Sequence, residues 1–453
     1  MLQFLVDYTF FNLVLFIYLK KNKFRNKKNT ILAILNKQES SMALNYIWVG
    51  FFLIAFAVGL FKLVFLGDVE VFTQMMDAVF NRAKMGFELS IGLTGALALW
   101  MGILKIGEKG GLIKIISRLL SPLFTKLFPE LPKNHPAIGT MILNLSANML
   151  GLDNSATPIG LKAMKELQTA NPNKDTASDA QIMFLVLNTS GMTLIPVSIL
   201  ALRASAHSTN PTDVFIPILI ATFISTMVGL IVTSIVQKIN LFRKTILLYL
   251  GGATAFVVGL IFYLGTLSPE QMQLFSKLLT SVLLLSIIIT FITVAVFKKV
   301  NVYDAFIEGA KEGFNVAVMI IPYLIAMLVA VGVFTASGAM DYVIEGLRSF
   351  FAMTGVDTRF VDGLPTAFMK PLSGGGARGL MVESWGADYV NVDSFVGKLT
   401  SILQGSTETT FYVLAVYFGS VKIKNVRYAA TVGLIADLAG IIAAILVAYF
   451  FFG

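Results

Sequence analysis

Four short segments of this chain gather polar side chains that could bind a ligand. They are 143–167, 188–196, 369–385 and 404–410, and the last, QGSTETT, runs directly into the apolar stretch FYVLAVYFGS. Hydroxyl, amide and ionisable groups gathered in this way fix the orientation of a bound polar molecule. The residues that we expect to bind substrate are Asn144, Ser146, Asn148, Asp153, Asn154, Ser155, Thr157, Gln181, Asn188, Thr189, Ser190, Lys370, Ser373, Gly374, Gly375, Gly376, Arg378, Gln404, Ser406, Thr407 and Glu408.

The segment MKPLSGGGARG is suited to an anionic group. Lys370 and Arg378 carry positive charge, and the three glycines at 374–376 let backbone amides approach a ligand closely. A helix that starts near Thr157–Pro158 would add its N–H groups and the positive end of its dipole. The glycine run does not complete the phosphate loop GxxxxGK[ST].

Other polar residues suggest hydrogen bonding and ion coupling. The hydrogen-bonding candidates are Asn144, Asn148 and Asn154. Asp153 and Glu408 are candidates for coupling to a proton or a cation. Other interpretations stay open: Ser, Thr and Gly in membrane helices often serve packing, and the two carboxylates can cap helices at the membrane interface. Arg378 can also pair with Glu408 or Glu383.

The elements that position these segments are predicted to be membrane helices. The chain has 453 residues, 56% hydrophobic and 13% charged, whereas soluble domains carry about 25% charged residues. Several windows reach the roughly 20 apolar residues that cross a bilayer, including 46–66, 215–232, 245–267 and 279–297. A β-barrel would show short alternating segments instead. We therefore predict an all-α polytopic integral membrane protein.

Composition excludes several other classes. The net charge of +9 comes from Lys and Arg in short loops, which are topology signals rather than a nucleic-acid surface. The chain has no cysteine, and its two histidines, His135 and His207, lie in unrelated loops, so we expect no metal centre. No pairing of a nucleophile with a base is recognisable, and we expect neither an enzyme nor a cofactor.

Residues 1–41 differ from the rest of the chain. An apolar stretch is followed by KKNKFRNKK and a polar run that ends before Met42. No small-residue cleavage site is present, so a removed signal peptide is not expected. A signal-anchor helix and a misplaced start with translation from Met42 both stay open.

The chain contains an internal duplication at a separation of 227 residues. DAVFNRAKMGF (77–87) aligns with DAFIEGAKEGF (304–314), and Leu145-Ser146 aligns with Leu372-Ser373. MFLVL (183–187) then aligns with TFYVL (410–414), which places Gln181 opposite Glu408. We expect repeat 1 at 42–240, a linker with one transmembrane helix at 241–273, and repeat 2 at 274–453.

The basic loops predict how the repeats cross the membrane. The expected spans are 46–66, 87–106, 181–201, 213–236, 245–267, 277–297, 316–336, 402–420 and 430–452, and a basic amphipathic stretch lies at 107–134. Four groups of basic residues lie within 105–134, 237–245, 298–311 and 422–427. All four can face the cytoplasm only if the short segments 136–157 and 364–381 re-enter the membrane rather than span it. This arrangement gives two inverted-topology repeats of about four spanning helices, each with a re-entrant broken-helix hairpin. The alternative, in which both short segments span, places 422–427 outside.

The sequence resembles a bacterial family in both halves. NMLGLDNSATPIGLKAMKELQ (148–168) is similar to spore maturation protein A, and KPLSGGGARG (370–379) and QGSTETTFYVLAVYFGS (404–420) are similar to spore maturation protein B. The resemblance covers about 42–235 and 274–453. It implies a fusion of the two proteins, each with the nucleoside-recognition or gate domain found in nucleoside and ferrous-iron transporters. It assigns no substrate and no functional residue.

Together these observations predict a multi-pass permease of the bacterial cytoplasmic membrane. Its substrate, small and polar or anionic, would pass through a midplane site between the repeats, and neither a nucleoside nor a lipid-linked molecule is excluded. Coupling to H⁺ or Na⁺ and homo-oligomer formation stay open, and the lipid bilayer is the other expected partner. The alternative is a membrane scaffold without transport activity for envelope or spore maturation, which would lack a wet interior.

Overall fold

The computed structural model describes residues 45–132, 135–150, 153–386 and 389–453. The proposed extension at 1–41 lies outside these residues, as do residues 151–152 and the side chains of Asp153, Asn154 and Ser155. The described residues form helices joined by turns and loops, with one isolated bridge between Thr176 and Asn425. This confirms the all-α class.

The described residues form no β-sheet, and successive helices are joined by loops and turns. After the helix at Asn45–Leu66, the labelled helices are α3 (Val71–Gly110), α4 (Leu112–Leu127), α5 (Pro136–Met149), α6 (Asp153–Ala170), α7 (Asp179–Thr189), α8 (Val197–Ser205), α9 (Phe215–Val236), α10 (Lys244–Ile246), α11 (Gly252–Gly265), α12 (Pro269–Phe297), α13 (Val302–Ala336), α14 (Ala339–Ala352), α15 (Leu364–Met369), α16 (Gly374–Ser384), α17 (Phe395–Gly405), α18 (Thr410–Ser420) and α19 (Ala429–Phe452).

Seven of the described helices are long and apolar enough to cross a bilayer. They are Asn45–Leu66, Val71–Gly110, Phe215–Val236, Lys244–Gly265, Glu270–Phe297, Val302–Ala336 and Ala429–Phe452. Their exposed faces carry large apolar side chains such as Phe256, Phe262 and Leu446, which is what contact with lipid requires. The chain is therefore a multi-pass membrane protein.

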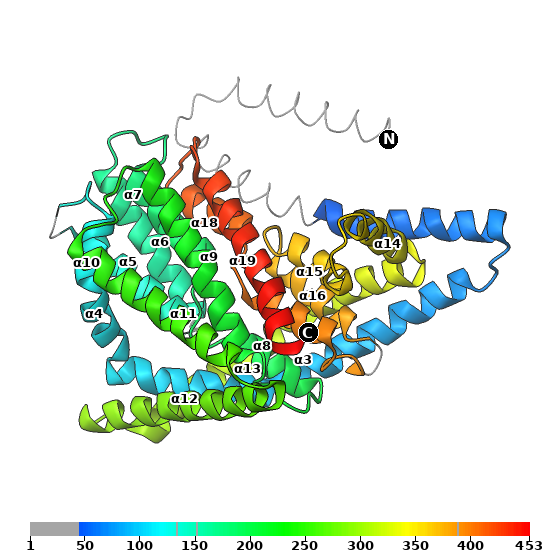
Figure 1. Ribbon diagram of the computed structural model, residues 1–453, viewed down its shortest axis with the longest axis horizontal. Coiled ribbons are helices and arrows are strands. Elements are labelled where there is room, and N and C mark those ends of the chain that lie inside the picture. The colour runs from blue at the N-terminus through cyan, green and yellow to red at the C-terminus, as the bar shows by residue number, and fades with distance from the viewer. Residues whose placement is uncertain (1–44, 133–134, 151–152, 387–388) are drawn as a thin grey trace, which may run out of the picture.

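The two longest helices, α3 and α13, form an antiparallel pair at the centre of the molecule. Gly86 of α3 contacts Ile325 of α13, whereas Gly313, closer to the start of α13, contacts Leu97. A Cβ atom added at Gly313 would lie 2.6 Å from the carbonyl oxygen of Leu97, so glycine permits this close approach. Figure 1 shows α12 along the lower edge of the view, with α3 and α13 above it.

Both long helices begin earlier than the sequence analysis expects. The expected spans begin at residues 87 and 316, and the helices begin at Val71 and Val302. The amphipathic helix α4 lies within the predicted stretch 107–134, but its counterpart α14 was not expected. α4 starts at Leu112 and α14 at Ala339, 227 positions apart, so the duplication extends through this region.

The separation between equivalent elements falls from 227 to 216 in the second part of each half. α7 begins at Asp179 and α17 at Phe395, 216 positions apart, and each follows a serine N-cap, Ser178 or Ser394. α6 has 18 residues and α16 has 11, which accounts for most of the change. The expected pairing of MFLVL with TFYVL, and of Gln181 with Glu408, is therefore wrong.

Two expected spans are broken helices. Residues 181–201 form α7 and α8 with a break at 190–196, and residues 402–420 form α17 and α18 with a break at 406–409. The first helical run ends at Thr189, Gly191 then adopts φ +52°, and Pro196 is the N-cap of α8. QGSTETT was expected to begin a helix, but Gln404 and Gly405 end α17 instead. In the corrected register the two breaks occupy equivalent positions.

The two short polar-rich segments form helical hairpins. α5 packs along α6, and α15 along α16. α5 has 14 residues and is therefore about 21 Å long, shorter than a bilayer core of about 30 Å. The predicted helix start near Thr157–Pro158 is wrong by about one turn, because α6 begins at Asp153 and Pro158 lies inside it.

Candidate functional site

The helix breaks at 190–196 and 406–409 meet where half one (repeat 1, 42–240) contacts half two (repeat 2, 274–453). The backbone N–H of Glu408 donates to the carbonyl oxygen of Thr189 at 2.9 Å. Gly191 adopts φ +52°, and a Cβ atom there would lie 2.7 Å from Cγ of Glu408. Glycine at this position thus allows both the left-handed backbone and the close contact with the other break.

Each break is also tied to the hairpin of its own half. The N–H of Leu194 donates to the carbonyl oxygen of Met149 at 2.7 Å, and the N–H of Phe411 donates to that of Pro371 at 3.1 Å. Met149 ends α5, and Pro371 lies in the turn between α15 and α16. The same kind of bond therefore brings the end of α5 and the turn between α15 and α16 to the same central region.

A pocket of about 130 Å³ lies where these segments converge. Its lining is Asn148, Thr193, Ile195, Pro196, Val197, Ser198, Ile199, Lys370, Gly374, Arg378, Gln404, Gly405, Thr407, Glu408 and Thr409. Seven residues predicted from the sequence are among them: Asn148, Lys370, Gly374, Arg378, Gln404, Thr407 and Glu408. The structure thus brings together predicted residues from three of the four polar segments with Thr193, Ile195 and Pro196 of the fourth.

The pocket has two cationic groups and one acidic group in its lining. Lys370 is 6% exposed, Arg378 is half-buried and Glu408 is exposed. Ser373 caps α16 by accepting a bond from the N–H of Gly376 at 3.0 Å, and Gln404 donates to the carbonyl oxygen of Gly374 at 3.2 Å. The start of α16 and its glycines therefore lie beside the cations, an arrangement that suits an anionic group.

Predicted asparagines form a hydrogen-bonded chain beside the pocket. Asn148 Nδ2 donates to Asn188 Oδ1 at 2.8 Å, and the hydroxyl of Tyr417 donates to the same oxygen at 3.3 Å. Asn144 Nδ2 lies 3.4 Å from the Tyr417 hydroxyl and 2.8 Å from the carbonyl oxygen of Ala156. Tyr417, absent from our sequence prediction, thus connects helices of both halves.

Several predicted residues have local roles. The hydroxyls of Thr189, Ser190 and Ser406 donate to carbonyl groups three residues earlier, as Ser and Thr commonly do in helices. Ser146 is buried in α5, Thr157 is half-buried in α6, and Gly375 is exposed in the first turn of α16.

Gln181 lies away from the pocket. It completes the capping box of α7 with Ser178 and hydrogen-bonds Asn171 and Gln168, two turns before the helix ends at Thr189. The structure therefore gives Gln181 a capping role at the opposite end of α7.

Sequence reasoning missed Asp437, a carboxylate in α19. Asp437 is 1% exposed, and the hydroxyls of Thr407 and Thr410 lie near enough to interact with it. A lone acidic residue inside an apolar span is a signal that could have identified it, because ionisable residues in membrane helices are rare and usually functional.

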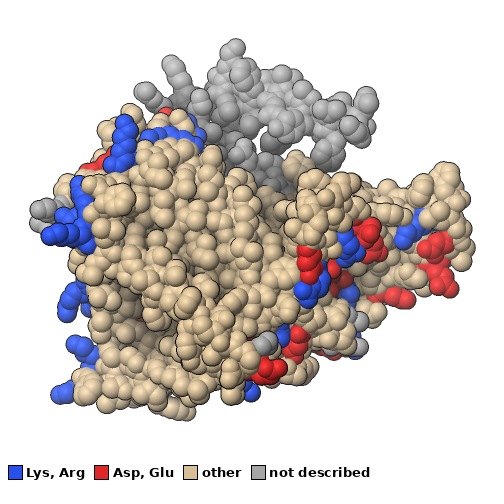
Figure 2. All heavy atoms as spheres, viewed as in Figure 1, with Lys and Arg blue, Asp and Glu red and all other residues tan. Residues whose placement is uncertain are grey.

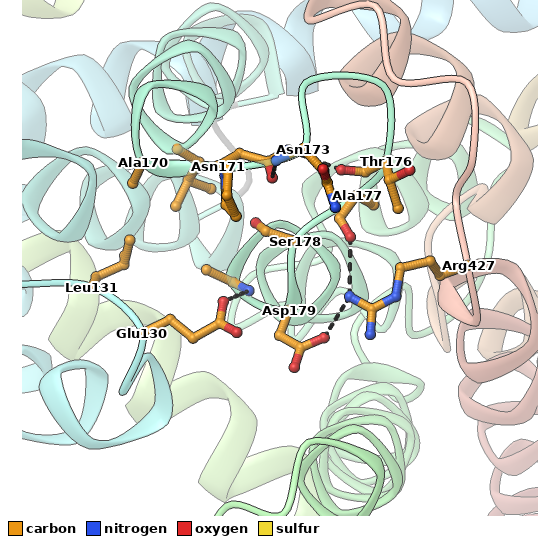
Figure 3. A pocket seen from close by; sticks show the side chains of 13 residues that line it. Glu130, Leu131, Ala170, Asn171, Asn173, Thr176, Ala177, Ser178, Asp179 and Arg427 are labelled. Carbon is orange, nitrogen blue, oxygen red and sulfur yellow. Dashed lines mark hydrogen bonds and ion pairs between the residues drawn. The ribbon is translucent and has the colours of Figure 1, made fainter.

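A larger pocket, of about 540 Å³, lies at the other end of α7 (Figure 3). Its charged lining residues are Glu130, Asp179 and Arg427. Arg427 Nη1 lies 2.7 Å from Asp179 Oδ1 and donates to the carbonyl oxygen of Ala177 at 3.1 Å. Burial and repulsion from Asp179 raise the pKa of Glu130.

The hydroxyl of Tyr428 also donates to Asp179, at 2.9 Å. Burial raises the pKa of Tyr428 to about 12, and the negative charge of Asp179 acts in the same direction. Tyr428 is therefore protonated at neutral pH. The contacts of Arg427 and Tyr428 fasten half two to the start of α7 in half one.

Known proteins match the two halves of the chain separately. The nucleoside-recognition (Gate) family matches residues 90–206 and again 317–424, and these ranges begin 227 positions apart. The fold and these matches define a multi-pass helical membrane protein with two Gate domains. No solved structure matches the chain.

Two relatives specify the family. The chain is 41% identical over 188 residues to spore maturation protein A of Bacillus subtilis (strain 168), which covers 42% of this chain and 92% of the relative. It is 46% identical over 156 residues to spore maturation protein B of the same organism, covering 34% of this chain and 85% of the relative. The chain belongs to the spore maturation protein A and B family, as a fusion of both proteins, and the resemblance stated from the sequence is confirmed.

Proposed function

We propose that the protein is a permease of the bacterial cytoplasmic membrane, without enzymatic activity, that moves a small polar or anionic substrate between its two halves. The observation that carries this proposal is the pocket where the two helix breaks meet. Its lining joins Asn148 and Thr193 of half one to Lys370, Arg378 and Glu408 of half two. Broken helices that face each other at a polar site are typical of secondary transporters.

The size and charge of the pocket favour a small anionic group. Its volume of about 130 Å³ is below the roughly 300–1,000 Å³ of sites that enclose a drug-sized ligand. A phosphate or carboxylate group fits this volume, and Lys370, Arg378 and the start of α16 are suited to bind it. A nucleoside or the rest of a lipid-linked molecule would require the pocket to widen.

The antiparallel pairing of equivalent helices supports inverted repeats. α3 runs antiparallel to its counterpart α13, and α9 runs antiparallel to α19, since Ser225 contacts Gly440 whereas Gly229, further along α9, contacts Ala436. If these helices span the bilayer, the axis that relates the halves lies in the membrane plane. In this proposal the α5–α6 and α15–α16 hairpins enter from opposite sides and return.

Surface charge supports the same orientation. Figure 2 shows Lys and Arg gathered at the left edge, over α4, α7 and α10, and a broad uncharged face over α9, α11 and α19. An uncharged band suits lipid, and an excess of Lys and Arg marks the cytoplasmic side. The left edge of the molecule is therefore the cytoplasmic side in this proposal.

Cysteine accessibility tests the wet interior, because the native chain contains no cysteine. Thr193→Cys and Ser198→Cys in the pocket lining should react with a membrane-impermeant maleimide in permeabilised cells, and Leu185→Cys, fully buried in α7, is the unreactive control. Arg348→Cys should label from outside and Lys422→Cys from inside only. A pocket that stays inert from both sides would favour the membrane-scaffold alternative.

Proteoliposomes test transport directly. Uptake of radiolabelled uridine and of inorganic phosphate would be compared between the wild-type protein and Lys370→Ala. We expect uptake of at least one probe, reduced tenfold or more in the variant, because a buried cation that binds an anion contributes well over 1 kcal/mol. Lys84→Ala, an exposed lysine of α3, is the matched control. Full activity of Lys370→Ala would overturn the role of the pocket.

A further inference from the structure

Asp437 is the starting point, because nothing in the proposed substrate pocket uses it. It is the one charged residue in the 24-residue helix α19, and 1% of its surface is exposed. A carboxylate at this depth is unfavourable unless a charge partner or a bound ion compensates it. Its surroundings therefore indicate what it binds.

Three buried groups with unused hydrogen-bonding capacity face one another at this point. Among the described residues, both carboxylate oxygens of Asp437 and the hydroxyls of Thr407 and Thr410 are buried and form no hydrogen bond of acceptable distance and angle. These two hydroxyls nevertheless lie near enough to interact with the carboxylate. The three side chains therefore gather at one place with hydrogen-bonding capacity that the described residues do not use.

Two glycines of α19 allow this convergence. Gly433 and Gly440 lie one turn before and after Asp437, on the same face of the helix. A Cβ atom at Gly433 would lie 2.8 Å from Cγ2 of Thr410, and one at Gly440 would lie 2.6 Å from Cγ2 of Thr407. Larger residues at either glycine would push the threonines away from the carboxylate.

The helix break supplies further oxygen atoms. The carbonyl oxygen of Ser406 lies 3.2 Å from the Cβ position of Gly440, one turn from Asp437. Ser406 is the C-cap of α17, where carbonyl groups lack partners within the helix and carry the negative end of its dipole. Carboxylate, hydroxyl and carbonyl oxygens at one place are ligands for a hard cation.

The charges nearby favour a monovalent ion. Lys370, in the turn before α16, and Glu408, in the break, are the charged groups that act on Asp437. From α9 and α7, the elements packed against α19 on its other side, the polar neighbours are Ser225, whose hydroxyl donates to the carbonyl oxygen of Ala436 at 2.9 Å, and Thr189. The opposite charges of Lys370 and Glu408 offset each other, so the carboxylate of Asp437 is left to balance a single positive charge, whereas divalent-ion sites use more carboxylates.

We propose that Asp437, Thr407, Thr410 and the carbonyl groups freed at residues 405–406 form a site for a monovalent cation of the size of Na⁺. Thr407 also lines the substrate pocket, so the ion would lie one side-chain layer behind the substrate. An ion at this place would hold the break in the conformation that binds substrate. This link between ion binding and substrate binding rests on the proposed function, whereas binding of the ion itself does not.

Thermal unfolding of the purified full-length protein tests the site without substrate. At pH 7.5 and constant ionic strength, replacing choline chloride with NaCl should raise the midpoint by about 2 to 5 °C, with a smaller rise in KCl. Asp437→Asn should abolish the response to Na⁺. Thr410→Val keeps the shape of the side chain and should raise the Na⁺ concentration that gives half of the response at least tenfold. This variant keeps the test valid if Asp437→Asn does not fold.

Thr431→Ala, which removes an exposed hydroxyl on the same helix, is the matched control and should respond as the wild type does. Equal midpoints in NaCl, KCl and choline chloride, or a Na⁺ response that survives in Asp437→Asn, would overturn the cation site. A midpoint that follows pH but not Na⁺, and loses this dependence in Asp437→Asn, would identify a proton site instead. A Na⁺ response in a protein that transports neither probe would keep the site and reject the permease.

Discussion

Arg203 of half one and Arg427 of half two make the same kind of contact at opposite ends of the molecule. Arg203 Nη1 donates to the carbonyl oxygen of Val392 at 2.8 Å, just before the N-cap of α17. Arg427 Nη1 donates to that of Ala177 at 3.1 Å, just before the N-cap of α7. Each half thus holds the start of the broken helix of the other half with an arginine.

The Arg203 contact is closed to solvent on the arginine side, although the side chain of Asp393 is 28% exposed. Its guanidinium is fully buried and lies 3.0 Å from Asp213 and 2.9 Å from Asp393, and Lys398 lies 3.1 Å from the other oxygen of Asp213. Although partial burial acts to raise it, hydrogen bonds from Ser208 and Thr209 hold the pKa of Asp393 below its ordinary value. Asp393 is therefore ionised at neutral pH.

The Arg427 contact is open. The side chain of Arg427 is 36% exposed and that of Asp179 is 26% exposed, and the pocket of about 540 Å³ lies beside them (Figure 3). Solvent-exposed ion pairs contribute little, whereas buried ones are costly to break. The comparison indicates a molecule that is fixed at the Arg203 end and can open at the Arg427 end, the cytoplasmic side in the proposed topology.

Arg203→Met should have the largest effect on stability. It leaves Asp213, whose side chain is 14% exposed, with reduced compensation, and breaking a buried ion pair costs about 3–5 kcal/mol. Thermal unfolding in detergent should show a large fall in midpoint, or the protein should not accumulate. Arg427→Met is the matched variant. If Arg203→Met does not fold, Asp393→Asn should show a smaller fall; equal midpoints for both arginine variants would contradict the comparison.

Arg427→Met should change stability little and accessibility more. Loss of an exposed pair costs about 0.2–1 kcal/mol, but it frees the start of α7 from half two. A cysteine introduced at Ala170, in the lining of the larger pocket, should then react with maleimide several-fold faster. Lys174→Met is the control, since Lys174 bonds only carbonyl groups of its own half. Unchanged labelling in Arg427→Met would show that this end is fixed too.

Much of the fold was predictable from residue composition along the chain. Apolar runs identified the helix at 245–267 and the last helix at 430–452, and the polar segments 188–196 and 404–410 marked the places where two expected spans break. Breaks are visible in sequence because backbone groups that leave the helix need polar partners nearby. The positions of Lys370 and Glu408 at one pocket followed from the same reasoning.

What the sequence did not reveal depends on contacts between distant segments. The change in separation from 227 to 216 is hidden because apolar helices tolerate many alignments, so the local match of MFLVL to TFYVL was misleading. Arg203 meets Asp393 across 190 positions, and no local pattern encodes that pair. Tyr417 resembles any aromatic residue of an apolar helix until Asn144 and Asn188 are brought next to it.

The smallest expected effect is a pH dependence confined to the open end. Burial and Asp179 raise the pKa of Glu130, so the folded state holds this proton more tightly than the unfolded state does. Stability therefore decreases as pH rises from about 4.5 through the folded pKa of Glu130, and the penalty is complete above it.

Glu130→Gln removes the charge, and its amide oxygen can still accept the bond from the N–H of Ala180, which Glu130 receives at 3.4 Å. The variant should unfold at a slightly higher temperature than the wild type at pH 8 and at the same temperature near pH 4. Glu345→Gln, an exposed carboxylate of α14, is the control that should show no such gain. A gain for Glu130→Gln that persists at pH 4 would show that charge at the open end is not its cause.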